Sequence, residues 1–168
     1  MRKAKWLFLL WTLFLLGAAS CENTGATMTQ TPTAVQTDVA KLGEMINLPF
    51  VPQSALWQVG QKGQDSSGLG PGDWDLTAVL TLDADSQAAL RQEVDQLQPL
   101  GPVIVELAFV RDWFPSDVSA AFVPAQAGDF LQLAVPRFEA SRFARSPLAN
   151  GYFFLTSEGT VFLYLFTT

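Results

Sequence analysis

Histidine is missing from the 168-residue sequence, and cysteine occurs only once, at Cys21. Without histidine the chain lacks the most common general base and the most common zinc ligand of proteins. No serine can be activated by a histidine, and there is no phosphate-binding loop, dinucleotide fingerprint or metal-ligand spacing. These absences argue against an enzyme, and we expect neither a cofactor nor a metal site.

Positive charge is also scarce, with ten lysines and arginines against sixteen aspartates and glutamates. Three of the ten are Arg2, Lys3 and Lys5, so removal of the N-terminal segment changes the formal net charge from −6 to −9. Nucleic acids and anionic membrane surfaces are bound by clustered cations. We therefore expect no nucleic-acid partner for this chain.

A short apolar stretch, Trp6 to Leu16, follows the first cations and leads into the small residues Gly17 to Ser20. A positive start, a short apolar core and a small-residue end are typical of a secretory signal peptide. A membrane-spanning helix needs about 20 apolar residues, and this core is shorter unless the small residues are counted. The pattern favours a signal peptide over residues 1–20.

Cys21 follows Ala18-Ala19-Ser20, at the point where cleavage is expected. Ala18 and Ser20 suit an ordinary signal cleavage site, which would leave Cys21 as a free N-terminal thiol. Free thiols are unusual in oxidising compartments, where cysteines generally pair. The stretch Ala18-Ala19-Ser20-Cys21 also resembles the lipobox of bacterial lipoprotein precursors, with Ala18 standing where that class most often has leucine. The resemblance implies that Cys21 is diacylated and anchors the chain to the membrane of the cell envelope.

The resemblance covers only Met1 to Cys21. It implies that, in a Gram-negative host, Glu22 in place of an aspartate directs the protein to the outer membrane, facing the periplasm. Residues 21–38 are rich in threonine and poor in large apolar side chains, so they cannot bury enough surface to offset the entropy of ordering. We predict a flexible tether there, followed by one domain over residues 39–168, within the usual size range for a domain.

Residues 74–83 show the clearest periodic pattern of the domain, because apolar and polar side chains alternate. Strict alternation predicts a half-buried strand with one solvent-exposed face. The expected buried face consists of Trp74, Leu76, Ala78, Leu80 and Leu82. The expected exposed face consists of Asp75, Thr77, Val79, Thr81 and Asp83.

Other segments complete the predicted fold. A helix is expected over 87–98, with N-cap candidates in residues 83–86 and an Arg91–Asp95 pair on its surface. Pro115 begins a short helix to Phe122. Strands are expected at 55–60, 103–110 (a central strand) and 130–135, and 61–72 is expected to be a loop. Residues 152–155 and 161–166 predict a hairpin with Gly159 in its turn.

Helices and strands do not alternate strictly, and the chain closes with a hairpin. This order predicts an α+β fold with a largely antiparallel sheet and one main helix packed on it. A β-sandwich with a helical decoration is the alternative.

The segment Pro136 to Ser146 is the one basic departure from an acidic background, and it interleaves Arg137, Arg142 and Arg145 with two phenylalanines. These arginines are candidates for binding a lipid phosphate, a lipopolysaccharide or an acidic partner. The alternative is a surface loop whose arginines stay hydrated.

Tryptophans and carboxylates supply the other candidates. Trp57 and Trp74 follow buried patterns, whereas Trp113 lies between elements and is a candidate binding residue. Asp73 and Asp75 are about 7 Å apart along one strand and could hold a hard cation, but the sequence favours a solvated strand start. We expect a non-catalytic binding or assembly module with an envelope protein as partner. A cell-wall hydrolase using Asp and Glu is the alternative.

Overall fold

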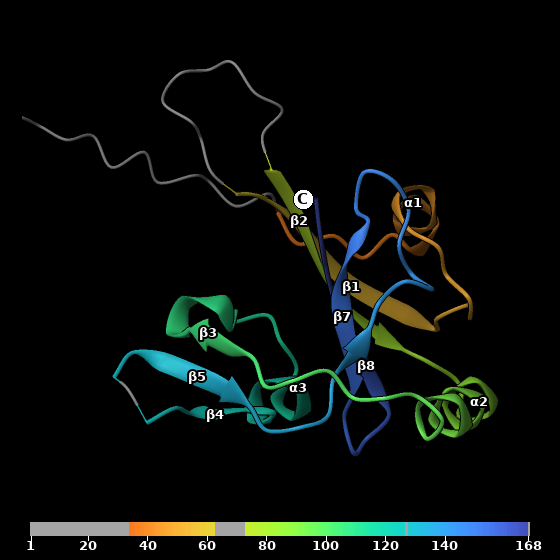
Figure 1. Cartoon of the computed structure of the whole chain (residues 1–168). Helices are drawn as coiled ribbons and strands as arrows, with labels where there is room; N and C mark the ends of the chain where they lie inside the picture. The colour runs from red at the N-terminus through yellow and green to blue at the C-terminus, as the bar shows by residue number, and fades with distance from the viewer. Residues whose placement is uncertain (1–33, 63–72, 127, 168) are drawn as a thin grey trace, which may run out of the picture. The chain divides into compact units, whose positions relative to one another are not determined.

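The computed structural model describes residues 34–62, 73–126 and 128–167 (Figure 1). All of them belong to one compact unit that spans Thr31–Thr168. The predicted signal peptide, Cys21, most of the predicted tether and nearly all of the predicted loop at 61–72 lie outside the described residues. Within the described ranges, no helix is long and apolar enough to cross a membrane.

The described residues of this unit form two antiparallel sheets and four short helical segments (Figure 1). The larger sheet has the order β1 (Ser54–Lys62), β2 (Asp73–Thr81), β8 (Thr160–Phe166), β7 (Asn150–Leu155) and β6 (Phe138–Glu139). The smaller sheet has the order β3 (Ile104–Glu106), β5 (Phe130–Leu133) and β4 (Phe122–Pro124). The helical segments are α1 (Val39–Met45), α2 (Ala84–Val94), η1 (Leu107–Phe109, a 3-10 turn) and α3 (Ser116–Ala120). The predicted α+β class and its largely antiparallel sheet are confirmed.

The face of β2 that was predicted to be exposed is partly covered, because Val79 is buried and Thr77 is half-buried, whereas Thr81 is exposed as predicted. Leu76, Ala78 and Leu80 belong to the first of two core clusters, which also includes Leu42 of α1 and Leu90 of α2. Val79, expected on the exposed face, is only 3% exposed because it lies in a second cluster beneath the smaller sheet. Alternation of apolar and polar residues shows which side chains share a face of the strand. It does not show whether another layer of the protein covers the second face.

The predicted burial of Trp74 is wrong. This residue was expected in the core, but its side chain is 49% exposed. Trp74 pairs with Gln61, next to the Lys62–Asp73 pair at which the two strands end, and Leu76 is the first residue of β2 that reaches the core cluster. Trp57, by contrast, is buried as predicted, and its indole Nε1 donates to Asp38 O at 3.1 Å.

The second cluster is dominated by aromatic rings, and it joins the two sheets. Phe162 of β8 stacks on Phe154 at 4.8 Å between ring centroids and meets Phe122 of β4 edge-on at 5.9 Å. Phe114 also contacts Phe162 edge-on, at 5.4 Å. Edge-to-face and offset pairs of this kind stabilise a core beyond the burial of their area. They fix the smaller sheet against the larger one.

The helix α2 overlaps the predicted helix over 87–98, but it begins earlier, at Ala84, and it also ends earlier. Asp83 caps its start, because Ser86 N donates to Asp83 Oδ1 at 2.7 Å. It ends at Val94 rather than at residue 98. The predicted Arg91–Asp95 pair is wrong, since Arg91 instead donates to Ser157 O in the β7–β8 turn, at 3.1 Å.

Residues 103–110 were predicted to form a central strand, and this is wrong. Only Ile104–Glu106 is extended, at the edge of the smaller sheet, and η1 follows at once. Val103 and Val105 pack on the second cluster, whereas Ile104 and Leu107 are 61% and 59% exposed. A short apolar run does not reveal whether one or both of its faces are covered.

Residues 34–38, at the end of the predicted tether, contact the domain. Gln36 forms an isolated bridge with Trp57, and Asp38 caps α1 by accepting from Lys41 N at 3.0 Å. The contacts of the domain therefore begin before Val39, the predicted boundary.

Candidate docking surface

The strand pairing of the smaller sheet shows which residues lie on its inner face and which on its outer face. Ile104, Gln132 and Val123 are paired across the three strands, and Glu106 pairs with Phe130. Because side chains alternate along a strand, these five residues share one face. Their neighbours Val105, Leu131, Phe122 and Leu133 face the second cluster. We call the side formed by Ile104, Glu106, Val123, Phe130 and Gln132 the outer face.

The outer face exposes large apolar side chains. Ile104 is 61% exposed, Phe130 44% and Val123 39%, and Leu107 lies next in the chain at 59%. Single exposed apolar residues are common on protein surfaces, but apolar groups gathered on one face are characteristic of interaction sites. No described element covers this face of the smaller sheet.

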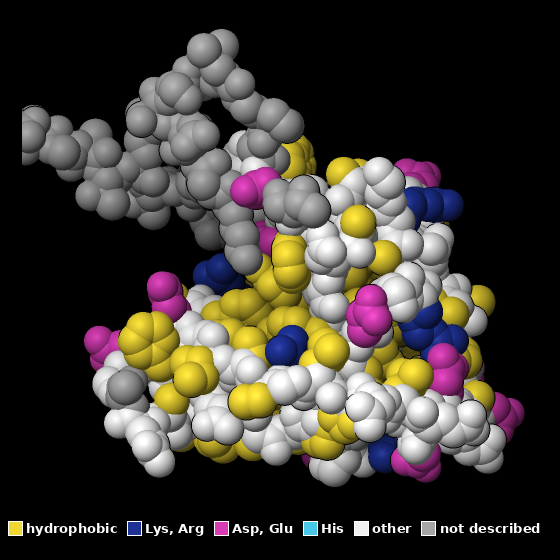
Figure 2. Space-filling view, in the orientation of Figure 1, with side chains coloured by type: hydrophobic (Ala, Val, Ile, Leu, Met, Phe, Trp, Pro, Cys, Tyr) yellow, Lys and Arg dark blue, Asp and Glu magenta, His cyan; other side chains and the backbone are white. Residues whose placement is uncertain are grey.

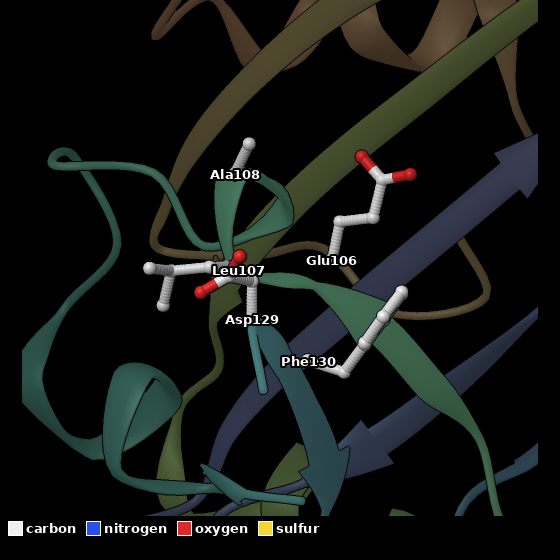
Figure 3. A pocket seen from close by; sticks show the side chains of 5 residues that line it. All are labelled: Glu106, Leu107, Ala108, Asp129 and Phe130. Carbon is white, nitrogen blue, oxygen red and sulfur yellow. The ribbon is translucent and has the colours of Figure 1, made fainter. Parts of the chain in front are cut away.

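A shallow depression of about 490 Å³ lies at one end of the outer face (Figure 3). It is lined by Glu106, Leu107, Ala108, Asp129 and Phe130. Leu107 N donates to Asp129 O at 3.0 Å, which fixes η1 to the start of β5. Figure 3 shows the carboxylates of Glu106 and Asp129 pointing in different directions, with apolar side chains around them.

The surroundings of the outer face are acidic. Two carboxylates, Glu106 and Asp129, line the depression beside the outer face, and no lysine or arginine is among its lining residues. Figure 2 shows hydrophobic side chains beside acidic ones at the end of the smaller sheet, on the left of the view. An apolar surface flanked by charge of one sign favours partners of the opposite sign.

The three candidate arginines are used inside the domain. Arg145 Nη1 donates to Gly43 O and Glu44 O at 3.0 and 2.8 Å, and so it stabilises the C-terminal end of α1. Arg142 forms an ion pair with Glu93. Both arginines connect the loop before β7 to a helix: Arg145 contacts α1, and Arg142 contacts α2.

Arg142 and Arg137 also lie over aromatic rings. The Arg142 guanidinium is 5.1 Å from the ring centroid of Phe50, and that of Arg137 is 5.0 Å from that of Tyr152. Arg137 Nε donates to Gly101 O at 2.8 Å. The structure therefore gives each candidate arginine an intramolecular contact, and these contacts lead to different parts of the domain.

Trp113 lies in the second cluster and contacts Phe114 edge-on at 4.7 Å. Its indole Nε1 is buried and has no hydrogen-bond partner among the described residues. The side chain is half-buried rather than presented on an open surface. Of the predicted binding residues, none lies on the outer face.

The carboxylates at the start of β2 are engaged by hydroxyl groups. Asp75 accepts from Tyr164 Oη at 3.2 Å, and Asp73 accepts from Thr167 Oγ1 at 3.4 Å. Within the described parts of the chain, no group of three or more Asp, Glu, His or Cys residues could hold a metal ion.

Two buried tyrosines and two aspartates have shifted pKa values, and at Asp83 the hydrogen bonds from Ser86 lower the pKa. Burial raises the pKa of Tyr152 above its usual value of 10.0, and burial together with the negative charge of Asp75 does the same for Tyr164. Burial also raises the pKa of Asp117, but hydrogen bonds from Thr160 and Thr156 outweigh it and lower the pKa below its usual value of 3.8.

Sequence reasoning did not identify the outer face. Its residues come from three short segments that lie far apart in the chain, and their juxtaposition depends on strand pairing. The available signal was the apolar run at 103–110, whose exposed and covered positions look alike in the sequence.

Comparisons with protein-family models, curated proteins and solved structures find no match for this chain. Its function must therefore be inferred from its own residues and geometry.

Proposed function

We propose that this protein is a lipid-anchored component of the bacterial cell envelope whose domain binds another protein through the outer face. The role is non-catalytic, that of a binding or assembly accessory. The lipid on Cys21 holds the chain at the membrane, on the periplasmic side of the outer membrane in a Gram-negative host, and the predicted tether lets the domain reach its partner.

One observation carries the proposal: the outer face exposes Ile104, Val123 and Phe130 together, next to Leu107. Leaving these side chains in water has a cost, because fully burying a residue of this kind contributes roughly 1.5–3 kcal/mol. A partner surface that covers them recovers part of this free energy. The inner side chains of the same strands fix the sheet, so the face is presented on a rigid support.

Site-specific photo-crosslinking in living cells tests this proposal. A photoreactive amino acid replaces Ile104 in one variant and Gln92, exposed on α2, in a matched control. We expect one dominant envelope protein to be crosslinked from position 104 and not from position 92, as identified by mass spectrometry. Equal crosslinking from both positions, or none from position 104, would contradict the proposal.

A further inference from the structure

Four strands lie at sheet edges in the part of the chain that the structure describes: β1, β6, β3 and β4. An open edge presents unpaired N–H and C=O groups that can pair with another chain. The middle of β1 is occupied, because Gln36 N donates to Trp57 O at 2.8 Å and Trp57 N donates to Gln36 O at 2.9 Å. Its edge is therefore interrupted by the chain itself.

The edges at β6 and β4 are also blocked. The strand β6 has only two residues, and Leu100 N donates to Arg137 O directly before it, at 2.8 Å. The outward-facing position at the end of β4 is Pro124, which has no N–H to donate. Proline on an edge strand is a common way in which proteins prevent further pairing.

The edge at β3 has no such protection among the described residues. Val103 O accepts from Leu133 N at 3.2 Å, and Leu107 N donates to Asp129 O at 3.0 Å, so alternate residues of this segment face β5. The backbone groups of Ile104 and Glu106 consequently face away from the sheet. Both side chains are exposed as well, on the outer face.

We propose that β3 accepts an extended segment of the partner protein as an added strand, with a lysine or arginine opposite Glu106 and an apolar side chain opposite Ile104. Strand addition supplies main-chain hydrogen bonds, and the alternate side chains supply specificity. This inference rests on the proposed function, because it specifies what the partner brings to the outer face.

The negative charge around β3 favours some binding partners over others. Residues directly opposite each other on neighbouring strands interact, and a cation opposite Glu106 is favourable where a carboxylate is not. A second copy of this chain would bring the same excess of carboxylates to the contact. A bilayer with anionic headgroups is repelled by them and offers no partners for an ordered row of backbone groups.

A displayed library of random short peptides, panned against the full-length chain in detergent, tests this inference. We expect the selected peptides to share a cation and an apolar residue two positions apart. Their affinity should fall roughly twofold to fivefold for Glu106→Gln, the range for one cross-strand charge pair. The matched control Glu44→Gln, on α1, should leave their affinity unchanged. Acidic peptides, or equal losses in both variants, would overturn the inference.

Backbone pairing has its own test. Ile104→Pro removes an outward-facing N–H without removing a hydrogen bond to β5, so it should abolish peptide binding. Amide hydrogen exchange of the unsubstituted chain is a second test, which does not depend on the folding of the Ile104→Pro variant. Binding of a selected peptide should slow exchange at Ile104 and Glu106, and unchanged exchange at both would overturn strand addition.

The two proposals fail in different ways. A partner crosslinked at position 104 whose contacting segment is acidic or helical would retain the proposed function and overturn the strand inference. Absence of any crosslink at position 104 would overturn the proposed function itself.

Discussion

Tyr152 and Tyr164 pair across β7 and β8, with ring centroids 5.6 Å apart, and they are the only two tyrosines of the chain. Both are nearly buried, at 5% and 6% exposure. Burial disfavours the phenolate, and at Tyr164 the hydrogen-bonded carboxylate of Asp75 disfavours it further. At the residue scale, the second cluster therefore keeps both hydroxyl groups neutral.

This arrangement predicts how the protein behaves in alkali. In the unfolded chain the tyrosines ionise near their usual pKa of 10.0, whereas in the folded chain the pKa of each is raised. Their contribution to stability is thus complete below pH 10.0 and decreases as the pH rises above it. Ultraviolet absorbance should show no phenolate near pH 10.0 while circular dichroism still reports the fold. Phenolate absorbance before any loss of structure would contradict this.

Asp117 and Thr156 predict an acid-side effect of opposite sign. Thr156 Oγ1 donates to Asp117 Oδ2 at 2.7 Å, and the pKa of Asp117 lies below its usual value. The stabilisation is present above the usual pKa of 3.8 and is lost as the pH falls through the lower folded pKa.

Thr156→Val should therefore lower the free energy of unfolding by about 1 kcal/mol at neutral pH, since the carboxylate is partly screened by solvent. Chemical denaturation across pH measures this difference, which should shrink in acid. Thr81→Val, at an exposed position of β2, is the control and should change little. A difference that stays constant into strong acid would show that Asp117 is not the group involved.

At the scale of elements, the hairpin of β7 and β8 is held by its turn. Thr156 N donates to Thr160 O at 2.9 Å, and Gly159 adopts a φ of 88°. A side chain at this φ is strained, and a Cβ here would also collide with the side chain of Gln87 on α2. The positive φ is the main reason that the turn favours glycine, because the end of the Gln87 side chain can shift to make room for a Cβ.

Gly159→Ala should lower the free energy of unfolding by about 1–2 kcal/mol, the cost of a left-handed conformation for a residue with a Cβ. Gly101→Ala is the matched control, because nothing lies within 4 Å of a Cβ at that position. Thermal or chemical denaturation compares the two variants. Equal stability of both would contradict this account of the turn.

The elements that were predicted correctly are those with a strong local signal. The hairpin follows from Gly159 and its flanking apolar runs, and the start of α2 follows from the Asp83 cap. The wrong predictions concern which faces of the strands are covered by another layer of the protein. Val79 is covered by the smaller sheet and Ile104 is covered by nothing described, yet both occur in apolar or alternating runs. Burial at such positions depends on contacts between distant segments, which a local pattern does not record.

The candidate site follows the same rule. Arg137, Arg142 and Arg145 stood out as a basic cluster in the sequence, but their partners lie in other segments: Gly101, Glu93 and the end of α1. The outer face needs the register of three strands before its residues meet. The expectation that the chain has no nucleic-acid partner rests on composition alone and stays a prediction.

At the scale of the whole molecule, the anchor can be tested without knowledge of the partner. If Cys21 is lipidated, the intact mass of the mature protein extracted from membranes should exceed that of the chain from Cys21 by the mass of its acyl groups. Cys21→Ser should release the protein from the membrane fraction. An unmodified Cys21 in the mature protein would contradict lipidation.

If a partner covers the outer face in the cell, a thiol placed on that face should be inaccessible to reagents there. Ile104→Cys places a thiol on the outer face, and Gln92→Cys places one on α2 as a control. Each variant is labelled with a hydrophilic maleimide in the intact envelope and after purification. We predict that position 104 is protected only in the envelope, while position 92 reacts equally in both. Equal labelling of position 104 in the two states would contradict the account.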